Sequence, residues 1–167
     1  MAVAHELGET LASRNITVVY GGARVGLMGA VADAALAGGG RVMGVIPEDL
    51  LERAGHDSLT ELHVVNSMHE RKALMYDSAD AFVILPGGIG TLDEFAEIVA
   101  WSTLAIHNKP IGLVNLHGYF DPLLGFLDHA VNEQFFKAEY RSLVVTAGGV
   151  GELLEKLGDY QPANCAS

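Results

Sequence analysis

The residues of this chain that could do chemistry are concentrated in one stretch, PGGIGTLDE at positions 86–94. An apolar run, residues 81–85, precedes it, and a helix-like segment, residues 94–106, follows. A strand, a glycine turn and a helix in this order form a cradle for phosphate, because glycines let backbone N–H groups approach an anion and the helix N-terminus adds about half a positive charge. Glu94 is unexpected beside an anion unless it caps the helix or takes part in a reaction.

Two further segments are expected at the same edge of the fold. Residues 21–29 begin with Gly21-Gly22 directly after a β-branched run, and residues 67–72 place Arg71 in the first turns of a helix. A cation at that position opposes the helix macrodipole, at a cost of about 0.3–1 kcal/mol. We therefore expect an anionic partner for Arg71, which is Glu94, a ligand phosphate, or both.

Each of these features also has a structural interpretation. Thr91 and Glu94 have the spacing of a capping box, so capping explains Glu94 as well as catalysis does on spacing alone. Arg71 can be a solvated charge, or an ion pair with Glu70 or Glu94, and the glycines can be tight turns. Three such segments between residues 21 and 94 nevertheless favour a ligand site over three unrelated turns.

Several familiar motifs do not match the sequence. No lysine follows Gly90 as a Walker loop requires, and Asp93 occupies the last glycine position of the dinucleotide fingerprint. The seven histidines are scattered without metal-ligand spacing, and no Gly-x-Ser-x-Gly elbow is present. The sequence therefore supports no nicotinamide cofactor, no metal and no serine nucleophile.

Alternating apolar and amphipathic segments predict the fold. Expected strands are residues 16–20, 41–46, 62–65, 80–85, 110–115 and 143–146; expected helices are residues 2–13, 25–37, 67–78, 94–106, 120–136 and 150–157. Strands that are almost continuous runs of Val, Ile and Leu, separated by helices, indicate a parallel sheet covered on both faces. We expect a doubly wound, Rossmann-like α/β fold, which binds ligands at the carboxyl ends of its strands.

The length of 167 residues indicates a single domain over residues 1–167, with residues 160–167 as a loose tail. Nucleotide-binding folds of this class usually open with a strand and its phosphate loop, whereas this chain opens with the helix at residues 2–13. Either that strand is missing or the chain starts late. If it is missing, a central element of the sheet must be replaced or done without.

Composition restricts the partners. The formal net charge of −11 argues against nucleic acid or an anionic membrane as a partner. No membrane-length apolar run and no secretory signal are visible, and Cys165 is the single cysteine, so we expect a cytoplasmic protein. The segment at residues 95–106 is apolar around most of its circumference, which favours a homodimer interface.

The motifs are similar to those of a known family. The stretch at residues 86–94 resembles the PGGxGTxxE motif of the LONELY GUY family, the cytokinin-activating phosphoribohydrolases. Residues 68–72 resemble the second signature of that family, and Tyr20-Gly21-Gly22 with residues 26–29 resembles its first glycine loop, in which Ala23 replaces a common glycine. The resemblance extends over residues 7–157. Many relatives carry the label "lysine decarboxylase", but nothing in the sequence indicates a pyridoxal-dependent enzyme.

The resemblance implies a Rossmann-like fold, a homodimer or possibly a hexamer, and no cofactor. The implied reaction is hydrolysis of the N-glycosidic bond of a nucleoside 5′-monophosphate, either AMP or a cytokinin riboside 5′-monophosphate. The implied catalytic pair is Arg71 and Glu94. The implied phosphate- and ribose-binding residues are Gly87, Gly88, Gly90 and Thr91, and further substrate-binding candidates are Gly21, Gly22, Met28, Met68 and Lys72.

A binding protein without catalysis is the main alternative. Molybdenum-cofactor carrier proteins resemble this fold and hold a phosphorylated ligand with glycine loops, and a nucleotide-sensing or scaffolding oligomer is a third interpretation. The presence of both Arg71 and Glu94 favours the enzyme. The opening strand of the family and its Gly-Ser loop have no counterpart before Ala2, which puts the activity of this chain in question.

Overall fold

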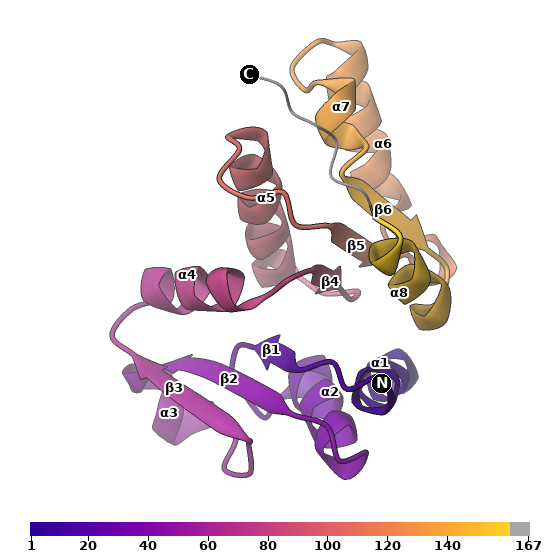
Figure 1. Ribbon diagram of the computed structural model, residues 1–167. Coiled ribbons are helices and arrows are strands. Elements are labelled where there is room, and N and C mark those ends of the chain that lie inside the picture. Colours follow the sequence, from indigo (N-terminus) through magenta and orange to yellow (C-terminus); the bar gives the residue numbers. More distant parts are fainter. Residues whose placement is uncertain (161–167) are drawn as a thin grey trace. The chain divides into compact units, whose positions relative to one another are not determined.

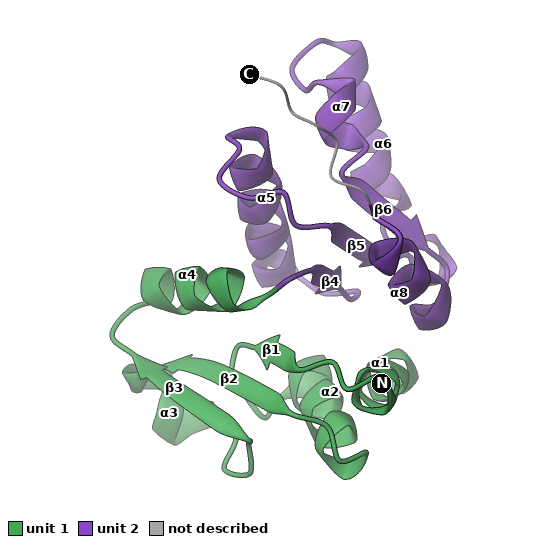
Figure 2. Cartoon of the chain, in the orientation of Figure 1, with its two compact units in different colours: residues 1–79 green, residues 80–167 purple. Residues whose placement is uncertain are grey.

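The computed structural model describes residues 1–160 (Figure 1). The chain divides into two compact units, unit 1 (residues 1–79) and unit 2 (residues 80–167), shown in green and purple in Figure 2. Each unit is built on its own three-stranded sheet. The expected tail lies outside the described residues from residue 161 onward, as does Cys165. A single domain over residues 1–167 stays a prediction.

Unit 1 contains three parallel strands in the order β1-β2-β3. Its elements, in chain order, are α1 (Ala2–Ser13), β1 (Val18–Tyr20), α2 (Gly26–Ala37), β2 (Val42–Pro47), α3 (Glu48–Ala54), β3 (Glu61–Val65) and α4 (Met68–Ser78). Figure 1 shows α4 on one face of this sheet and α2 on the other. The crossover from β1 to β2 runs through α2, and that from β2 to β3 runs through α3.

Small and β-branched residues explain the packing of unit 1. Val42 and Val45 of the central strand are fully buried. Helices α1 and α2 approach closely because Gly8 faces the backbone of α2, where a Cβ would overlap the carbonyl oxygen of Val31. At the start of α4 the Ser67 Oγ accepts a hydrogen bond from the Glu70 N–H at 3.1 Å, which confirms the predicted cap.

Unit 2 contains three parallel strands in the order β4-β5-β6. Its elements are β4 (Phe82–Ile84), α5 (Ile89–Thr103), β5 (Ile111–Val114), the short 3₁₀ helix η1 (Leu116–Gly118), α6 (Asp121–Asn132), α7 (Ala138–Arg141), β6 (Val144–Ala147) and α8 (Val150–Gly158). All four residues of the central strand β5 are buried. Helix α8 packs against β5 and β6 through Leu153, which approaches Gly112 closely.

The alternation of parallel strands and helices confirms the predicted Rossmann-like α/β class. Within each unit the three strands form a parallel sheet. The sequence did not predict α3 and α7, and the helix expected over residues 120–136 ends at Asn132, because the chain turns through Gln134 with a φ of +65°. Within residues 1–160, no helix has the length and apolar character needed to cross a membrane.

Candidate functional site

The phosphate loop, defined as residues 86–91, joins the carboxyl end of β4 to the start of α5. Gly88 is the N-cap of α5, and the N–H of Leu92 makes the first helical hydrogen bond, to the Gly88 carbonyl at 3.1 Å. The N–H groups of Ile89, Gly90 and Thr91 come before that bond. Such groups at a helix N-terminus are the donors available to an anion. Gly88, Ile89 and Gly90 are exposed, so this end of the helix is open to a ligand.

The glycines of the phosphate loop differ in what surrounds them. A Cβ on Gly87 would overlap the Thr91 hydroxyl, so the loop can fold this tightly against the first turn of α5 only with glycine there. Gly88 and Gly90 have open space at the corresponding positions. Gly87 is therefore required by packing, whereas Gly88 and Gly90 leave the backbone accessible.

Glu94 does not cap α5. The helix begins at Ile89, so Thr91 is its third residue and cannot be the N-cap of a box that ends at Glu94. The capping interpretation is therefore wrong, because the helix extends back through the glycines almost to the end of β4. Glu94 lies one turn into α5 and is half-buried. Capping therefore gives no reason for a carboxylate at this position, one turn after the phosphate loop.

Arg71, a residue of α4 in unit 1, is buried, with 9% of its surface exposed. Its Nε donates a hydrogen bond to the Val45 carbonyl of β2 at 3.3 Å. Its guanidinium lies over Gly21 so closely that a Cβ there would overlap it. The interpretation of Arg71 as a solvated charge is therefore wrong: the side chain turns inward along the sheet and ends at the first glycine loop.

A buried hydrogen-bonded chain supports the start of the first glycine loop, at Tyr20 and Gly22. The Tyr20 hydroxyl and His56 Nδ1 are 2.9 Å apart, and His56 Nε2 lies 3.1 Å from Asp33 Oδ1. The backbone N–H of His56 also donates a hydrogen bond to the Gly22 carbonyl at 3.1 Å. Gly22 has a φ of +69°. Only 3% of the surface of His56 is exposed. Burial, and secondarily the charge of Asp33, raise the pKa of Tyr20 above its ordinary range, so its hydroxyl stays protonated.

The LONELY GUY motifs thus lie on two sheet edges, and comparison with known proteins identifies the family. Residues 28–157 match the family model described as "Possible lysine decarboxylase". A cytokinin riboside 5′-monophosphate phosphoribohydrolase of Arabidopsis thaliana is 48% identical over 160 residues, which cover 95% of this chain and 75% of that protein. This chain belongs to the LONELY GUY family.

Other members of the LONELY GUY family are equally similar. A cytokinin riboside 5′-monophosphate phosphoribohydrolase of Rhodococcoides fascians is 51% identical over 145 residues, 86% of this chain and 73% of that protein. A probable one of Oryza sativa subsp. japonica is 49% identical over 160 residues, 95% of this chain and 66% of that protein. The chain thus spans about two thirds to three quarters of the length of these relatives.

Solved structures support the same fold. The X-ray structure of TM1055, a structural-genomics target, is 26% identical with a TM-score of 0.73, covering 95% of this chain and 87% of that one. The molybdenum cofactor binding protein of the phototrophic bacterium Rippkaea orientalis is 22% identical with a TM-score of 0.70, covering 94% and 85%. The second likeness shows the fold alone.

The predicted site residues of this LONELY GUY chain fall into two groups. Unit 1 brings Gly21 and Gly22 together with Arg71, and it leaves Met28 and Met68 on its surface, 40% and 46% exposed. Lys72 follows Arg71 on α4 and is half-buried. Unit 2 brings Gly87, Gly88, Gly90, Thr91 and Glu94 together at the start of α5. The pairing of Arg71 with Glu94 joins residues of different units and stays a prediction.

Tyr119 is a residue at the phosphate loop that the sequence motifs did not indicate. The Tyr119 hydroxyl donates a hydrogen bond to the Gly87 carbonyl at 2.7 Å. Tyr119 follows β5, whose carboxyl end neighbours that of β4 in the same parallel sheet. This adjacency was the signal available in the sequence, because loops that follow neighbouring parallel strands meet at one edge.

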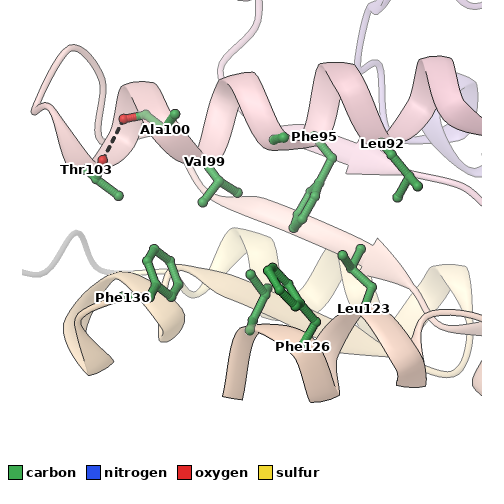
Figure 3. A pocket seen from close by; sticks show the side chains of 10 residues that line it. Leu92, Phe95, Val99, Ala100, Thr103, Leu123, Phe126 and Phe136 are labelled. Atoms are coloured by element: carbon green, nitrogen blue, oxygen red, sulfur yellow. Dashed lines mark hydrogen bonds between the residues drawn. The ribbon is translucent and has the colours of Figure 1, made fainter. Parts of the chain in front are cut away.

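Unit 2 also contains an apolar groove between α5 and the chain from α6 onward. Figure 3 shows Leu92, Phe95 and Val99 of α5 facing Leu123, Phe126 and Phe136. Its volume is about 400 Å³. Phe126 is 64% exposed at this surface.

Proposed function

We propose that this chain is a phosphoribohydrolase that cleaves the N-glycosidic bond of a nucleoside 5′-monophosphate. The substrate is AMP or a cytokinin riboside 5′-monophosphate, and the products are the free base and ribose 5-phosphate. Relatives that are 48–51% identical to this chain are named for that activity on cytokinin riboside 5′-monophosphates. We assign the same activity to this chain through the residues that match the family motifs.

The observation that carries the proposal is the geometry of the phosphate loop. The glycine-rich turn at residues 86–91 ends in a helix N-terminus with exposed backbone, and the half-buried Glu94 follows one turn later. A phosphate held by the N–H groups at this end carries its ribose with it. The separation of Glu94 from the phosphate loop by one helical turn suits a substrate whose phosphate and reacting carbon are also a short distance apart.

The chemistry explains why a carboxylate follows an anion site. Breaking the C1′–N9 bond leaves positive charge on the ribose, and the base departs with the bonding electrons and takes up a proton. A water molecule then supplies the oxygen on C1′. Glu94 stabilises the ribose charge and orients or deprotonates this water, as carboxylates do in glycoside hydrolysis.

Arg71 has a separate role in the proposal. A guanidinium is always charged and binds oxyanions in a fixed geometry. Its hydrogen bond to Val45 and its contact with Gly21 hold it in one orientation within unit 1. We assign it to the substrate oxygens and to keeping Glu94 ionised, because an opposite charge nearby favours the charged form of a carboxyl group.

A cofactor carrier is the competing proposal. A molybdenum cofactor binding protein, 22% identical to this chain, shares its fold, and that likeness carries no function to this chain. The enzymes are about twice as similar in sequence, at 48–51% identity. The enzyme is therefore the better proposal.

The test is a product assay on a matched set of substrates. The purified chain is incubated with AMP, the 5′-monophosphate of N6-isopentenyladenosine, and the two nucleosides that lack phosphate, and the free base is quantified. We expect base from at least one monophosphate and at least 100-fold less from its nucleoside. Release of no base from either monophosphate would reject the enzyme, and equal rates with and without phosphate would reject the phosphate loop as the binding site.

We further propose that the apolar groove of unit 2 is a homodimer interface. Leu92 and Phe126, which are 37% and 64% exposed, belong to an apolar surface that a monomer would leave in water (Figure 3). Light scattering is expected to give at least a dimer for the unmodified chain and a monomer for Phe126→Asp. The control Leu50→Asp changes an exposed leucine of α3 and should keep the assembly. A monomeric unmodified chain would contradict the interface, and a hexamer would require a second contact surface.

A further inference from the structure

We infer that Tyr119 is a positioning residue of the phosphate loop, which fixes the direction in which the Gly88 N–H points. This inference rests on the proposed function, because it assigns a role to Tyr119 in binding the substrate phosphate. Its observation is the hydrogen bond at 2.7 Å from the Tyr119 hydroxyl to the Gly87 carbonyl.

The bond acts through the geometry of the peptide group. The Gly87 C=O and the Gly88 N–H belong to one planar trans peptide, so they point in opposite directions. A donor that holds the carbonyl on one side therefore holds the N–H on the other. The Gly88 backbone is exposed, and this N–H belongs to the N-cap residue of α5, next to the helix donors that an anion would use.

The peptide needs such a constraint because glycines flank it on both sides. Rotation of a peptide group requires opposite changes in ψ of the first residue and φ of the second, and glycine permits a far wider range of both than other residues. Thr91 packs against the α-carbon of Gly87 and restricts the loop as a whole. The hydrogen bond from the Tyr119 hydroxyl is a side-chain contact that sets the orientation of this peptide.

Contacts within the loop after β5 fix the position of Tyr119. The Asn115 Oδ1 accepts from the Phe120 N–H at 2.8 Å, and the Asn115 Nδ2 donates to Asp121 at 2.7 Å. His117 and Gly118 adopt φ values of +52° and +73°, which turn the chain sharply before Tyr119. The Tyr119 ring then stands edge-on to Phe120 at 5.1 Å between centroids, and Phe120 is almost fully buried.

Tyr119 itself is 53% exposed, so its hydroxyl contributes little to the stability of the fold. A neutral hydrogen bond of this kind corresponds to about a 3- to 10-fold change in an equilibrium constant. The inference therefore predicts a binding effect of this size without a matching loss of stability.

The experiment compares Tyr119→Phe with Tyr140→Phe, which removes a hydroxyl from α7, elsewhere in unit 2. For each protein the Kd of ribose 5-phosphate is measured by calorimetry, kcat and KM are measured with AMP or the prenylated monophosphate, and the midpoint of urea unfolding is recorded. For Tyr119→Phe we expect the Kd and KM to rise about 3- to 10-fold, with kcat within about twofold and the urea midpoint unchanged. Tyr140→Phe should leave all four values unchanged.

The outcomes separate this inference from the proposed function. Unchanged Kd and KM in Tyr119→Phe would overturn it, as would an equal change in Tyr140→Phe or a fall in kcat with an unchanged KM. If the unmodified chain binds ribose 5-phosphate but releases no base, the enzymatic proposal fails, and the Kd comparison still decides the role of Tyr119. If the unmodified chain does not bind ribose 5-phosphate, the inference is overturned as well.

Discussion

The two glycine loops of this chain follow parallel strands in the same way, yet they are held by opposite means. The first, after β1, is fixed from within: Tyr20 and His56 form a buried hydrogen-bonded chain, and the Arg71 guanidinium lies over Gly21. The second, after β4, is fixed from outside: its support is the exposed hydroxyl of Tyr119 on Gly87.

The same sequence pattern, glycines directly after a strand, therefore occurs both in a loop that packs against a protein side chain and in a loop that is open to a ligand. In the first loop the glycine is needed because a side chain of the protein occupies the space that a Cβ would take. In the second loop Gly87 is packed in the same way against Thr91, whereas Gly88 and Gly90 face open space, which a substrate can occupy. The first loop is therefore a support for Arg71, and the second is the proposed phosphate site.

The largest expected effect is that of Gly21→Ala, which tests whether the first loop serves Arg71. The added Cβ would overlap the guanidinium and displace it. Because small displacements of a catalytic group can cost about 100-fold in rate, we expect kcat/KM to fall by about 100-fold or more. The matched control Gly151→Ala lies in α8 with open space around it and should keep activity. Near-normal activity in Gly21→Ala would mean that Arg71 can move without consequence.

A smaller effect is expected from His56→Ala, which tests whether the first loop is a structural support. The substitution removes the buried imidazole that is hydrogen-bonded to the Tyr20 hydroxyl, so we expect the free energy of unfolding to fall by about 2 kcal/mol. The control His129→Ala changes an exposed histidine of α6 and should stay within about 0.5 kcal/mol. Urea unfolding measures the stability of both variants. Equal stability would show that the hydrogen bond between Tyr20 and His56 does not stabilise the fold.

The smallest effect is expected from a pair of glycine substitutions in the phosphate loop. Gly87→Ala meets the Thr91 hydroxyl, so we expect the Kd of ribose 5-phosphate to rise about 10-fold and stability to fall by about 1–2 kcal/mol. Gly88→Ala faces open space and should unfold like the unmodified chain. If Gly88→Ala were the less stable of the two, the assignment of packing to Gly87 would be wrong.

Much of the fold could be predicted from local patterns. The apolar runs gave the strands of both sheets to within two residues or so, and the Ser67-x-x-Glu70 spacing gave the start of α4. Helix α5 was expected to begin at residue 94 but begins at Ile89. Glycines are poor helix formers inside a helix, yet at a helix start they leave the N–H groups accessible, so composition alone placed this boundary too late.

The parts of the site that could not be predicted depend on tertiary contacts. Tyr20 and His56 are 36 residues apart, and Gly87 and Tyr119 are 32 apart. No periodicity links residues at such distances. The orientation of Arg71 was hidden for the same reason, because its position near a helix start suggests solvent, whereas the neighbouring strand β2 offers it a carbonyl to bind.

The central claim is that Glu94 acts on the ribose while the loop before it holds the phosphate. The most direct measurement compares Glu94→Gln with the unmodified chain in two assays, base release from the preferred nucleoside monophosphate and calorimetric binding of ribose 5-phosphate. We predict that kcat falls by about 100-fold or more, while the Kd of ribose 5-phosphate changes by less than about threefold. Turnover by Glu94→Gln at the rate of the unmodified chain would contradict the account.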